Sequence, residues 1–188
     1  MQMHQLGLPG VLEIVPDRFG DDRGFFSETF SAERFAAAGI DGPWVQDNHS
    51  LSRPANVLRG LHFQVSPFQQ KKLVRVVSGA ILDIVVDIRP GAPTFRRWIA
   101  QEISAEAWNQ VFVPTGMAHG FLTLVPDTEV LYKVSAPYSP AHERTIRYDD
   151  PDLAIAWPLA GAEPVLSRKD AAAPSLRDLL AGPDLEGL

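Results

Sequence analysis

Short runs of strand-forming residues, each bounded by Gly, Pro, Asn or Asp, constrain the fold of this chain more than any other feature. The expected strands span residues 57–64, 72–77, 80–88, 96–103, 110–113, 119–125, 129–136 and 143–148. Helical patterns are confined to residues 32–38 and 174–181. Many short strands at such spacing are typical of an all-β sandwich or barrel. The sequence therefore predicts a mainly β fold with a few short helices.

The clearest strand pattern lies in residues 80–88, where apolar residues alternate with a set that includes Asp83 and Asp87. Strict alternation predicts a strand with one face in the core and the other in solvent. Ser78-Gly79, directly before it, predicts a hairpin turn. Two environments remain open for Asp83: a partner inside a pocket, or a solvent-facing position on the strand.

The N-terminal part of the chain predicts less regular structure. Residues 11–30 are expected to form short extended segments joined by a turn over residues 20–24, and residues 43–52 a weak strand. Ser31 is a suitable N-cap for the first helix, and Gly39 is a suitable stop.

The C-terminal helix, near residues 174–181, is predicted by Pro174 near its start and Gly182 after its end. Prolines are spread along the chain and do not form a linker, and no internal repeat or low-complexity block occurs. We therefore expect residues 1–188 to form a single domain.

Composition and charge exclude several classes of protein. A formal net charge of −6 at pH 7 argues against general nucleic-acid binding, which needs a basic face. No apolar run is long enough to span a membrane, and the N-terminus lacks a basic region followed by an apolar one, so we expect a cytoplasmic protein with no membrane partner. Because the chain has no cysteine, disulfides, thiolate metal sites and a cysteine nucleophile are excluded together.

Residues 114–120 have the Pro-x-Gly-x-x-His form of the second cupin motif. Cupins, which this segment resembles, are small jelly-roll barrels that commonly hold a metal through His-x-His, a Glu and this later His. The first motif would begin at residues 60–64, with Gln64 where a second ligand histidine would stand and Lys71 and Lys72 in place of the Glu. A cation repels a divalent metal, and two histidines make a poor site. The resemblance implies a cupin-type jelly-roll β-barrel or sandwich, and the ligand set predicts no metal and no other cofactor.

Several polar residues on or near the apolar strands suit proton abstraction beside a carbonyl. A histidine base needs a carboxylate that fixes its tautomer and stabilises the imidazolium. A tyrosine can donate a proton in a dry pocket, and cations can stabilise an enolate. Hydride and phosphoryl transfer are disfavoured because the chain has neither Gly-x-Gly-x-x-Gly after a strand nor a P-loop. The residues with suitable side chains are Arg59, His62, Lys72, His119, Tyr132 and Asp170.

Eight motifs occur in the order found in one cupin family. They are DRGFFSE at 22–28, QDNHS at 46–50, VLRGLHFQ at 57–64, QKKLV at 70–74, DIVVDIR at 83–89, PTGMAHGF at 114–121, LYK at 131–133 and SRKD at 167–170. Together they resemble the dTDP-4-dehydrorhamnose 3,5-epimerase family, the metal-free cupins of dTDP-L-rhamnose biosynthesis. One tetrapeptide is a weak signal, whereas eight in register cover almost the whole chain, from about Gly10 to Asp170.

Carried over by position, the resemblance implies that His62 is the base that takes the proton from the sugar carbon, with Asp170 as its partner. Tyr132 would return a proton from the other face, which inverts the centre. Lys72 would stabilise the enolate at the C4 oxygen. These four are the implied catalytic residues.

The resemblance also implies a binding site for the rest of the dTDP-sugar. Tyr138 would stack on the thymine. Arg23 and Glu28 would reach a neighbouring subunit's site through an exchanged N-terminal strand, which implies a homodimer. The implied substrate-binding residues are Arg23, Glu28, Gln46, Asn48, Arg59, His119, Tyr138, Glu143 and Lys169.

Two local features decide whether this assignment is possible. Strict alternation in residues 57–64 puts Arg59 and His62 on opposite faces, so both can line a site only if Gly60 forms a bulge or bend. Lys71 and Lys72 are adjacent, and only the Gln-x-Lys-Leu-Val register selects Lys72.

The expected reaction is epimerisation of dTDP-4-dehydro-6-deoxy-D-glucose at C3 and C5 to dTDP-4-dehydro-L-rhamnose. The alternative is a C3-only epimerase of a related dTDP-4-keto-deoxysugar, which could use the same base and acid. A metal-dependent cupin, such as a dioxygenase, is disfavoured by Gln64 and the missing Glu. A non-catalytic sugar-binding cupin would not need a base and an acid on opposing strands.

Overall fold

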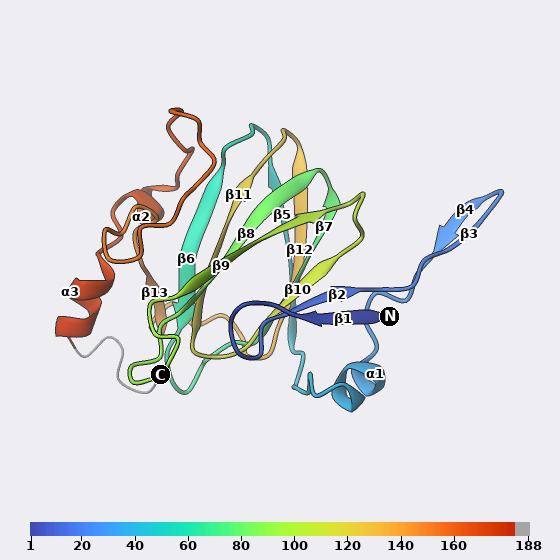
Figure 1. Ribbon diagram of the computed structural model, residues 1–188, viewed down its shortest axis with the longest axis horizontal. Coiled ribbons are helices and arrows are strands. Elements are labelled where there is room, and N and C mark those ends of the chain that lie inside the picture. The colour runs from blue at the N-terminus through green and yellow to red at the C-terminus, as the bar shows by residue number, and fades with distance from the viewer. Residues whose placement is uncertain (183–188) are drawn as a thin grey trace.

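The computed structural model describes residues 1–182, and antiparallel strands make up most of its regular structure (Figure 1). The strands are β1 (Gln2–Gln5), β2 (Leu12–Val15), β3 (Phe19–Asp21), β4 (Gly24–Phe26), β5 (Gln46–Ser52), β6 (Leu58–Gln64), β7 (Lys72–Ser78), β8 (Ala80–Asp87), β9 (Trp98–Ser104), β10 (Gln110–Val113), β11 (Met117–Thr123), β12 (Thr128–Val134) and β13 (Glu143–Thr145). The helices are α1 (Ala32–Ala37), α2 (Arg168–Ala171) and α3 (Leu176–Ala181). The prediction of a mainly β fold with a few short helices is confirmed.

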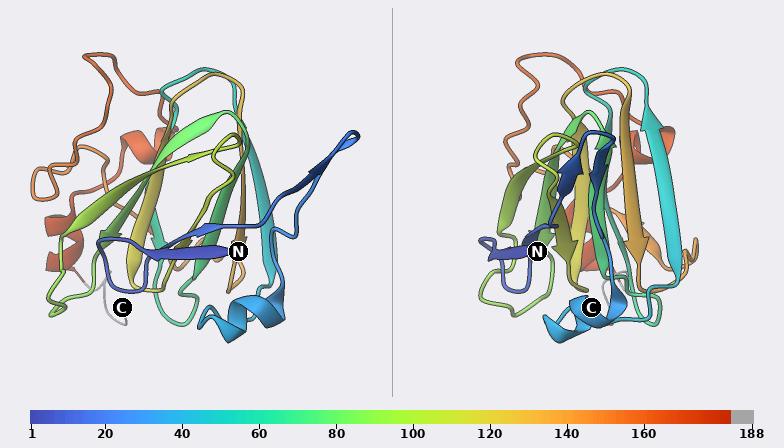
Figure 2. Two further views of the ribbon diagram at one scale, coloured as in Figure 1. Left: turned by 45° about the vertical axis from the view of Figure 1, so that its right-hand side comes forward. Right: turned by 90° about the vertical axis from the view of Figure 1, so that its right-hand side faces the viewer.

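Two antiparallel sheets form a sandwich, whose layers are seen edge-on in the right-hand view of Figure 2. One sheet has the order β1-β2-β10-β7-β12-β5, and the other has the order β13-β6-β11-β8-β9. The sheets are not joined at their edges, so the predicted sandwich or barrel is a sandwich. Neighbouring strands are often far apart in the sequence, and the space between the sheets is therefore lined by many separate segments.

Strand β8 is buried on both faces, so the prediction of a half-buried strand is wrong. Ile81 and Val85 face the core between the sheets, whereas Ile84 and Val86 face a second core on the outer side. That outer face is covered by the C-terminal segment, including α3, whose packing the local alternation could not reveal. The two aspartates of the inward face, Asp83 and Asp87, are also buried, each 0% exposed.

The predicted hairpin at Ser78-Gly79 is also wrong. Strand β7, which precedes it, belongs to the six-stranded sheet, while β8, which follows, belongs to the five-stranded sheet. Gly79 has φ of 79°, a left-handed conformation that a glycine adopts easily. This glycine turns the chain from one layer of the sandwich into the other.

The first and last helices follow their sequence signals. Ser31 caps α1 by accepting from the Arg34 amide, and Gly39 follows its end with φ of 82°. Helix α3 begins later than predicted, because Ser175 is its N-cap and forms a capping box with Asp178. No helix within residues 1–182 is long and apolar enough to cross a bilayer.

The hairpin of β3 and β4 projects from the body of the sandwich (Figure 1). Phe19, Phe25 and Phe26 on this hairpin are exposed by 64%, 55% and 71%. Aromatic side chains gathered on a projecting arm form an apolar surface suited to a protein contact.

Candidate active site

Two adjoining cavities between the sheets hold most of the predicted site. The larger, of about 320 Å³, is lined by residues of β5, β6, β7, β11, β12 and α2. The smaller, of about 240 Å³, extends along β5 and the segment before β13. Both are lined by His62, Lys72, Tyr132, Tyr138 and Glu143. Together the two cavities collect all the predicted site residues except Arg23 and Glu28.

A third cavity, of about 340 Å³, lies on the outer face of the six-stranded sheet. Phe30, Leu73 and Arg75 contribute to its lining, which includes no histidine. Its ion pair is between Lys133 and Asp47, and it has no histidine with a carboxylate partner, so the two adjoining cavities between the sheets are the better candidate for chemistry.

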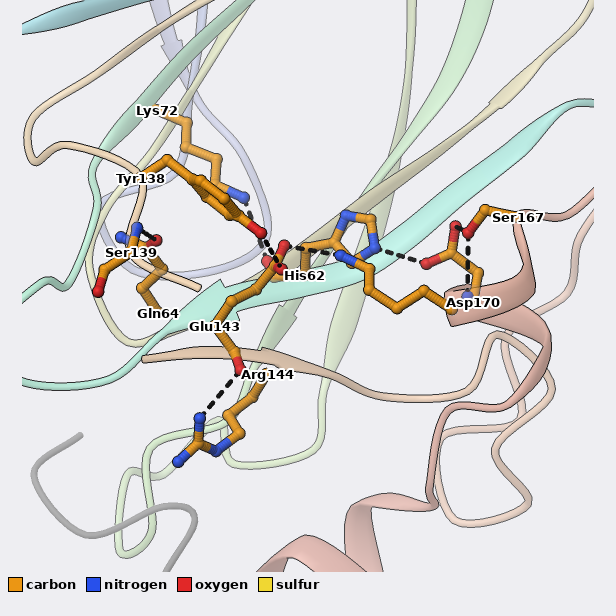
Figure 3. Close-up of polar contacts among 10 residues, drawn as sticks. His62, Gln64, Lys72, Tyr138, Ser139, Glu143, Arg144, Ser167 and Asp170 are labelled. Atoms are coloured by element: carbon orange, nitrogen blue, oxygen red, sulfur yellow. Dashed lines mark hydrogen bonds and ion pairs between the residues drawn. The ribbon is translucent and has the colours of Figure 1, made fainter. Parts of the chain in front are cut away.

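His62 and Asp170, which are 108 residues apart in the sequence, meet in the wall of the larger cavity (Figure 3). His62 Nε2 lies 2.6 Å from Asp170 Oδ1. Asp170 belongs to the short helix α2, whose N-cap is Ser167. The Ser167 hydroxyl donates to Asp170 Oδ2 at 2.8 Å and accepts from the Asp170 amide at 3.1 Å. Helix α2 therefore holds the Asp170 carboxylate against the His62 imidazole.

The Ser-Arg-Lys-Asp segment at residues 167–170 has a sequence pattern that indicates the start of a helix. A serine followed three residues later by an acidic residue is a helix-start pattern, and here it would have predicted both α2 and the contact between Ser167 and Asp170. Ser167 was not among the site residues predicted from the sequence.

The pair at His62 has the electrostatics of a general base. A carboxylate only accepts hydrogen bonds, so Nε2 carries the proton and Nδ1 is the basic atom. Burial lowers the pKa of His62, and the charge and hydrogen bond of Asp170 offset this only in part. Burial also opposes ionisation of Asp170, but the bonds from His62 and Ser167 outweigh it and the pKa of Asp170 is lowered. The dyad is thus a neutral imidazole beside a carboxylate near pH 7.

Arg59 and His62 both line the larger cavity because β6 is irregular at Gly60. In the pairing with β11, His62 lies opposite His119 and Arg59 lies opposite Phe121, so β6 has one residue more than β11 over this interval. Gly60 has φ of 130°, and a Cβ there would lie 2.5 Å from the Cα of Gly120. The predicted bulge at Gly60 is confirmed.

Of the adjacent lysines 71 and 72, Lys72 is the one that lines the cavities, as the motif register predicted. Its side chain is buried and its Nζ donates to the His62 carbonyl oxygen at 3.1 Å. Lys71 instead pairs with Asp41 at the surface, with Nζ 2.6 Å from Oδ1. Burial lowers the pKa of Lys72 to about 8, while Asp83 and Glu143 oppose the shift. Lys72 therefore remains mostly charged at pH 7 and can lose its proton at mildly alkaline pH.

Tyr132 approaches the same cavity from β12, in the sheet opposite His62. Burial raises the pKa of its phenol; the charge of Arg59 lowers it in part, and Glu143 adds to the rise. The phenol thus keeps its proton at neutral pH. A base on one sheet and a proton donor on the other can act on opposite faces of a substrate held between them.

His119 lies across the strand pair from His62 and has its own carboxylate. His119 Nε2 is 2.6 Å from Asp83 Oδ1, and both side chains are buried. Of the two environments left open for Asp83, the structure has the buried partner, which contacts the cavity-lining His119 but lines neither cavity itself.

The smaller cavity carries the residues predicted to hold the nucleotide. Gln46 donates to Asn48 Oδ1 at 2.7 Å and accepts from the Tyr138 amide at 3.0 Å. The Tyr138 hydroxyl donates to Glu143 Oε2, and Lys169 Nζ donates to Glu143 Oε1, each at 2.8 Å. Glu143 thus links the tyrosine of one loop to the helix that carries the base's partner.

Gln64 shapes this region through its side-chain amide. Its Nε2 donates to the carbonyl oxygens of Phe68 and Pro137, and its Oε1 accepts from the Ser139 amide at 2.7 Å (Figure 3). The amide therefore fixes the backbone on both sides of Tyr138. Within residues 1–182, no group of three or more His, Asp or Glu side chains is arranged to hold a metal ion.

Arg23 and Glu28 lie outside the cavities. Arg23 pairs with Asp21 in the projecting hairpin, and its side chain is 89% exposed. Glu28 pairs with Arg34 of α1, with Oε1 2.9 Å from Nη1. Neither side chain reaches the site of its own chain, and their role in a neighbouring subunit stays a prediction.

Comparison with known proteins gives a consistent result. The sequence model of the family described as dTDP-4-dehydrorhamnose 3,5-epimerase matches residues 5–178. A protein of this name from Sinorhizobium fredii is 48% identical over 179 residues, which cover 95% of this chain and 91% of the relative.

Two solved structures show how far the likeness extends. The RmlC epimerase of Mycobacterium tuberculosis superposes with a TM-score of 0.94 at 45% identity, over 100% of this chain and 94% of that one. ChmJ, a 3'-monoepimerase from Streptomyces bikiniensis in complex with dTDP-quinovose, gives a TM-score of 0.91 at 39% identity, over 97% and 92%. The family match and these identities show that the chain, a mainly β protein of cupin type, belongs to the dTDP-4-dehydrorhamnose 3,5-epimerase family.

Proposed function

We propose that this protein is an isomerase that epimerises dTDP-4-dehydro-6-deoxy-D-glucose at C3 and C5 to give dTDP-4-dehydro-L-rhamnose, in dTDP-L-rhamnose biosynthesis. The observation that carries the proposal is the His62–Asp170 pair, 2.6 Å apart in a cavity whose opposite wall contains Tyr132. Family membership supplies the class of substrate.

The chemistry follows from the acidity of carbons beside a ketone. The C4 carbonyl acidifies the hydrogens on C3 and C5, and His62 Nδ1 takes a proton from one of these carbons. The electrons move onto the C4 oxygen, where the charged Lys72 stabilises the resulting enolate. Tyr132 then protonates the carbon from the opposite face, which inverts it. Asp170 stabilises the imidazolium formed in the first step.

The same base and acid serve both carbons in this proposal if the sugar shifts in the cavity between the two inversions. Before the second inversion, His62 releases to water the proton that it took, and the Tyr132 phenolate takes a proton from water. The larger cavity is assigned to the sugar, with Arg59 and His119 as further contacts, and Arg59 also suits bidentate binding of a diphosphate oxygen pair. The smaller cavity is assigned to the nucleoside. Its polar residues include Gln46, Asn48 and Glu143, and Tyr138 offers a ring for the thymine. Lys169, which lines the larger cavity, is joined to this site through its bond to Glu143.

We further propose that the whole chain is one cytoplasmic domain that acts as a homodimer. The projecting β3–β4 hairpin carries exposed phenylalanines beside Arg23, whose position would suit an arm that reaches into a second subunit. In this arrangement Arg23 and Glu28 complete the nucleotide site of the neighbour.

The second candidate is a C3-only epimerase of a related dTDP-4-keto-deoxysugar. The specific observation in its favour is the TM-score of 0.91 with a 3'-monoepimerase. This 3'-monoepimerase is 39% identical to the chain, whereas the Sinorhizobium fredii 3,5-epimerase is 48% identical. We therefore prefer the reaction at both carbons.

Incubation with dTDP-4-dehydro-6-deoxy-D-glucose in heavy water separates the candidates. The proposed reaction puts deuterium on both C3 and C5, and a C3-only epimerase labels C3 alone. A protein that binds without catalysis labels neither carbon, and this result would overturn the proposal. Addition of EDTA is expected to leave the rate unchanged. A loss of activity that a divalent metal restores would contradict the metal-free reaction.

A further inference from the structure

Asp83 is a buried carboxylate, and one of its oxygens has no hydrogen-bond partner among residues 1–182. Its side chain lies on strand β8 and is 0% exposed. Oδ1 lies 2.6 Å from His119 Nε2, but the buried Oδ2 has no hydrogen-bond partner in the described part of the chain. An incompletely paired carboxylate deep in a protein is costly, so its retention suggests a task other than packing.

The surroundings of Asp83 are those of the proposed oxyanion site. Asp83 lies on the inward face of β8, opposite Phe121 in the pairing with β11 and two residues from Val85, which lies opposite His119. His119 and Lys72 line the same cavity. A carboxylate that accepts from His119 Nε2 fixes the ring and leaves Nδ1 as its second polar atom. Asp83 is therefore behind His119 in the five-stranded sheet, whereas Lys72 enters the cavity from β7 of the six-stranded sheet.

Lys72 experiences several charges in this cavity. Burial alone favours the neutral amine, and Asp83 is the first of the groups that oppose this shift, followed by Glu143 of β13, while Lys169 of α2 acts in the other direction. The remaining titratable or charged side chains that line the cavity are Arg59, His62, His119, Tyr132, Tyr138 and Asp170.

We infer that Asp83 is a positioning residue for the proposed reaction: its carboxylate is the buried counter-charge that holds His119 in place and keeps Lys72 charged, so that two donors are ready at the C4 oxygen. Asp83 itself does not touch the substrate in this assignment. The inference deepens the proposed function and rests on it for the identity of the oxyanion, but the charge state of Lys72 can be measured without substrate.

Strand β8 offers a matched control. Asp87 is also 0% exposed and lies on the same strand, but it pairs with Arg89 and Thr94 and lines neither cavity. Asp87→Asn removes an equally buried charge and is expected to lower thermal stability without affecting Lys72. Asp83→Asn keeps the size of the side chain, and Asp83→Ser, which is smaller, guards against a variant that fails through overpacking.

The titration of Lys72 is followed by NMR on protein labelled with ¹³C at the lysine Cε. The chain has only four lysines, at positions 71, 72, 133 and 169, so the signal is assigned by its loss in Lys72→Arg. In the wild type the midpoint is expected at about pH 8. Because an anion favours the ammonium, removal of the Asp83 charge lowers the midpoint, by about one unit. The midpoint in Asp87→Asn stays at the wild-type value.

An unchanged or higher midpoint in the folded Asp83 variants would overturn the inference, as would an equal downward shift in Asp87→Asn. Failure of both Asp83 variants to fold would make Asp83 a structural residue and would also overturn it. Turnover supplies a second readout. The alkaline limb of kcat/KM is expected to move to lower pH in Asp83→Asn while dTDP affinity is kept. A wild type that is inactive on the substrate would refute the proposed function but leave the NMR result intact.

Discussion

Replacement of Asp170 by asparagine removes one charge from the proposed dyad while keeping the size of the side chain. In the wild type His62 Nε2 lies 2.6 Å from the Asp170 carboxylate, and the Asn Oδ1 can still accept from it, but as a neutral and weaker acceptor. The Nδ2 group replaces the oxygen that accepted from Ser167, so the short helix α2 loses one bond but keeps its serine cap. The ground state is thus little changed, and the effect falls on the imidazolium that forms during proton abstraction.

The expected loss of rate follows from that one interaction. A hydrogen bond to a charged group contributes about 1.5–3 kcal/mol, which corresponds to roughly 10- to 150-fold in rate. Removal of the base itself, in His62→Asn, forfeits general-base catalysis, which is worth roughly 10²–10⁴-fold. We therefore expect kcat to fall by roughly 10- to 150-fold in Asp170→Asn and further in His62→Asn, with little change in dTDP affinity in either.

The pH dependence of kcat/KM should also change in Asp170→Asn, in the direction that the pKa of His62 sets. Asp170 raises the pKa of His62 against the larger effect of burial. Without the carboxylate the pKa of His62 falls further, so the imidazole stays neutral to lower pH and the acid limb of kcat/KM moves to lower pH. Steady-state kinetics between about pH 5 and pH 9 measure this limb.

A control for this experiment lies in α3, where Ser175 and Asp178 repeat the same serine-to-aspartate cap outside both cavities. Asp178→Asn is expected to weaken the helix and leave the kinetics unchanged. If the acid limb in Asp170→Asn stayed in place or moved to higher pH, His62 would not be the group that titrates. A rate equal to that of the wild type would remove Asp170 from the mechanism.

Two further outcomes test the acid and the bulge. Tyr132→Phe should slow inversion by roughly 10²-fold or more, and it should slow the loss of the proton from carbon less. Deuterium exchange without inversion then becomes visible in the substrate. Equal defects in both steps would contradict the assignment of Tyr132 as the acid alone. Gly60→Ala should lower the free energy of unfolding by about 3 kcal/mol or more. The added Cβ would lie 2.5 Å from the Cα of Gly120, and residue 60 has a φ of 130°. A melting temperature within a few degrees of the wild type would show that β6 can form without the bulge.

Much of the fold could be predicted from local sequence patterns, and most of the candidate site from the resemblance to a known family. The strands from β5 to β13 were expected where the structure has them, within a few residues, since turn residues mark their ends. Lys72 was separated from Lys71 by motif register, and its burial beside His62 agrees with that choice. The need for a bulge at Gly60 followed from two residues that had to share a face.

The failures have a common physical cause, since each depended on the packing of segments distant in the sequence. Alternation in β8 predicts one exposed face, but the sequence of the strand does not show that α3 covers the other side. Ser78-Gly79 has the composition of a hairpin turn, yet only the partners of β7 and β8 decide that it connects two sheets. Strand β1 was not expected, because its four residues acquire their pairing only through β2.

The position of Asp170 shows how such distant packing bears on function. A carboxylate 108 residues from its histidine cannot be assigned by local pattern, and the expectation came from resemblance alone. The structure supplies the missing physical reason: Ser167 caps a helix of four residues and binds the same carboxylate that faces His62. Helix α2 is too short to be stable by itself, so it depends on its cap and on contacts with β6. Loss of the Ser167 cap would therefore disturb the base through its partner, although the serine is not assigned a contact with the substrate.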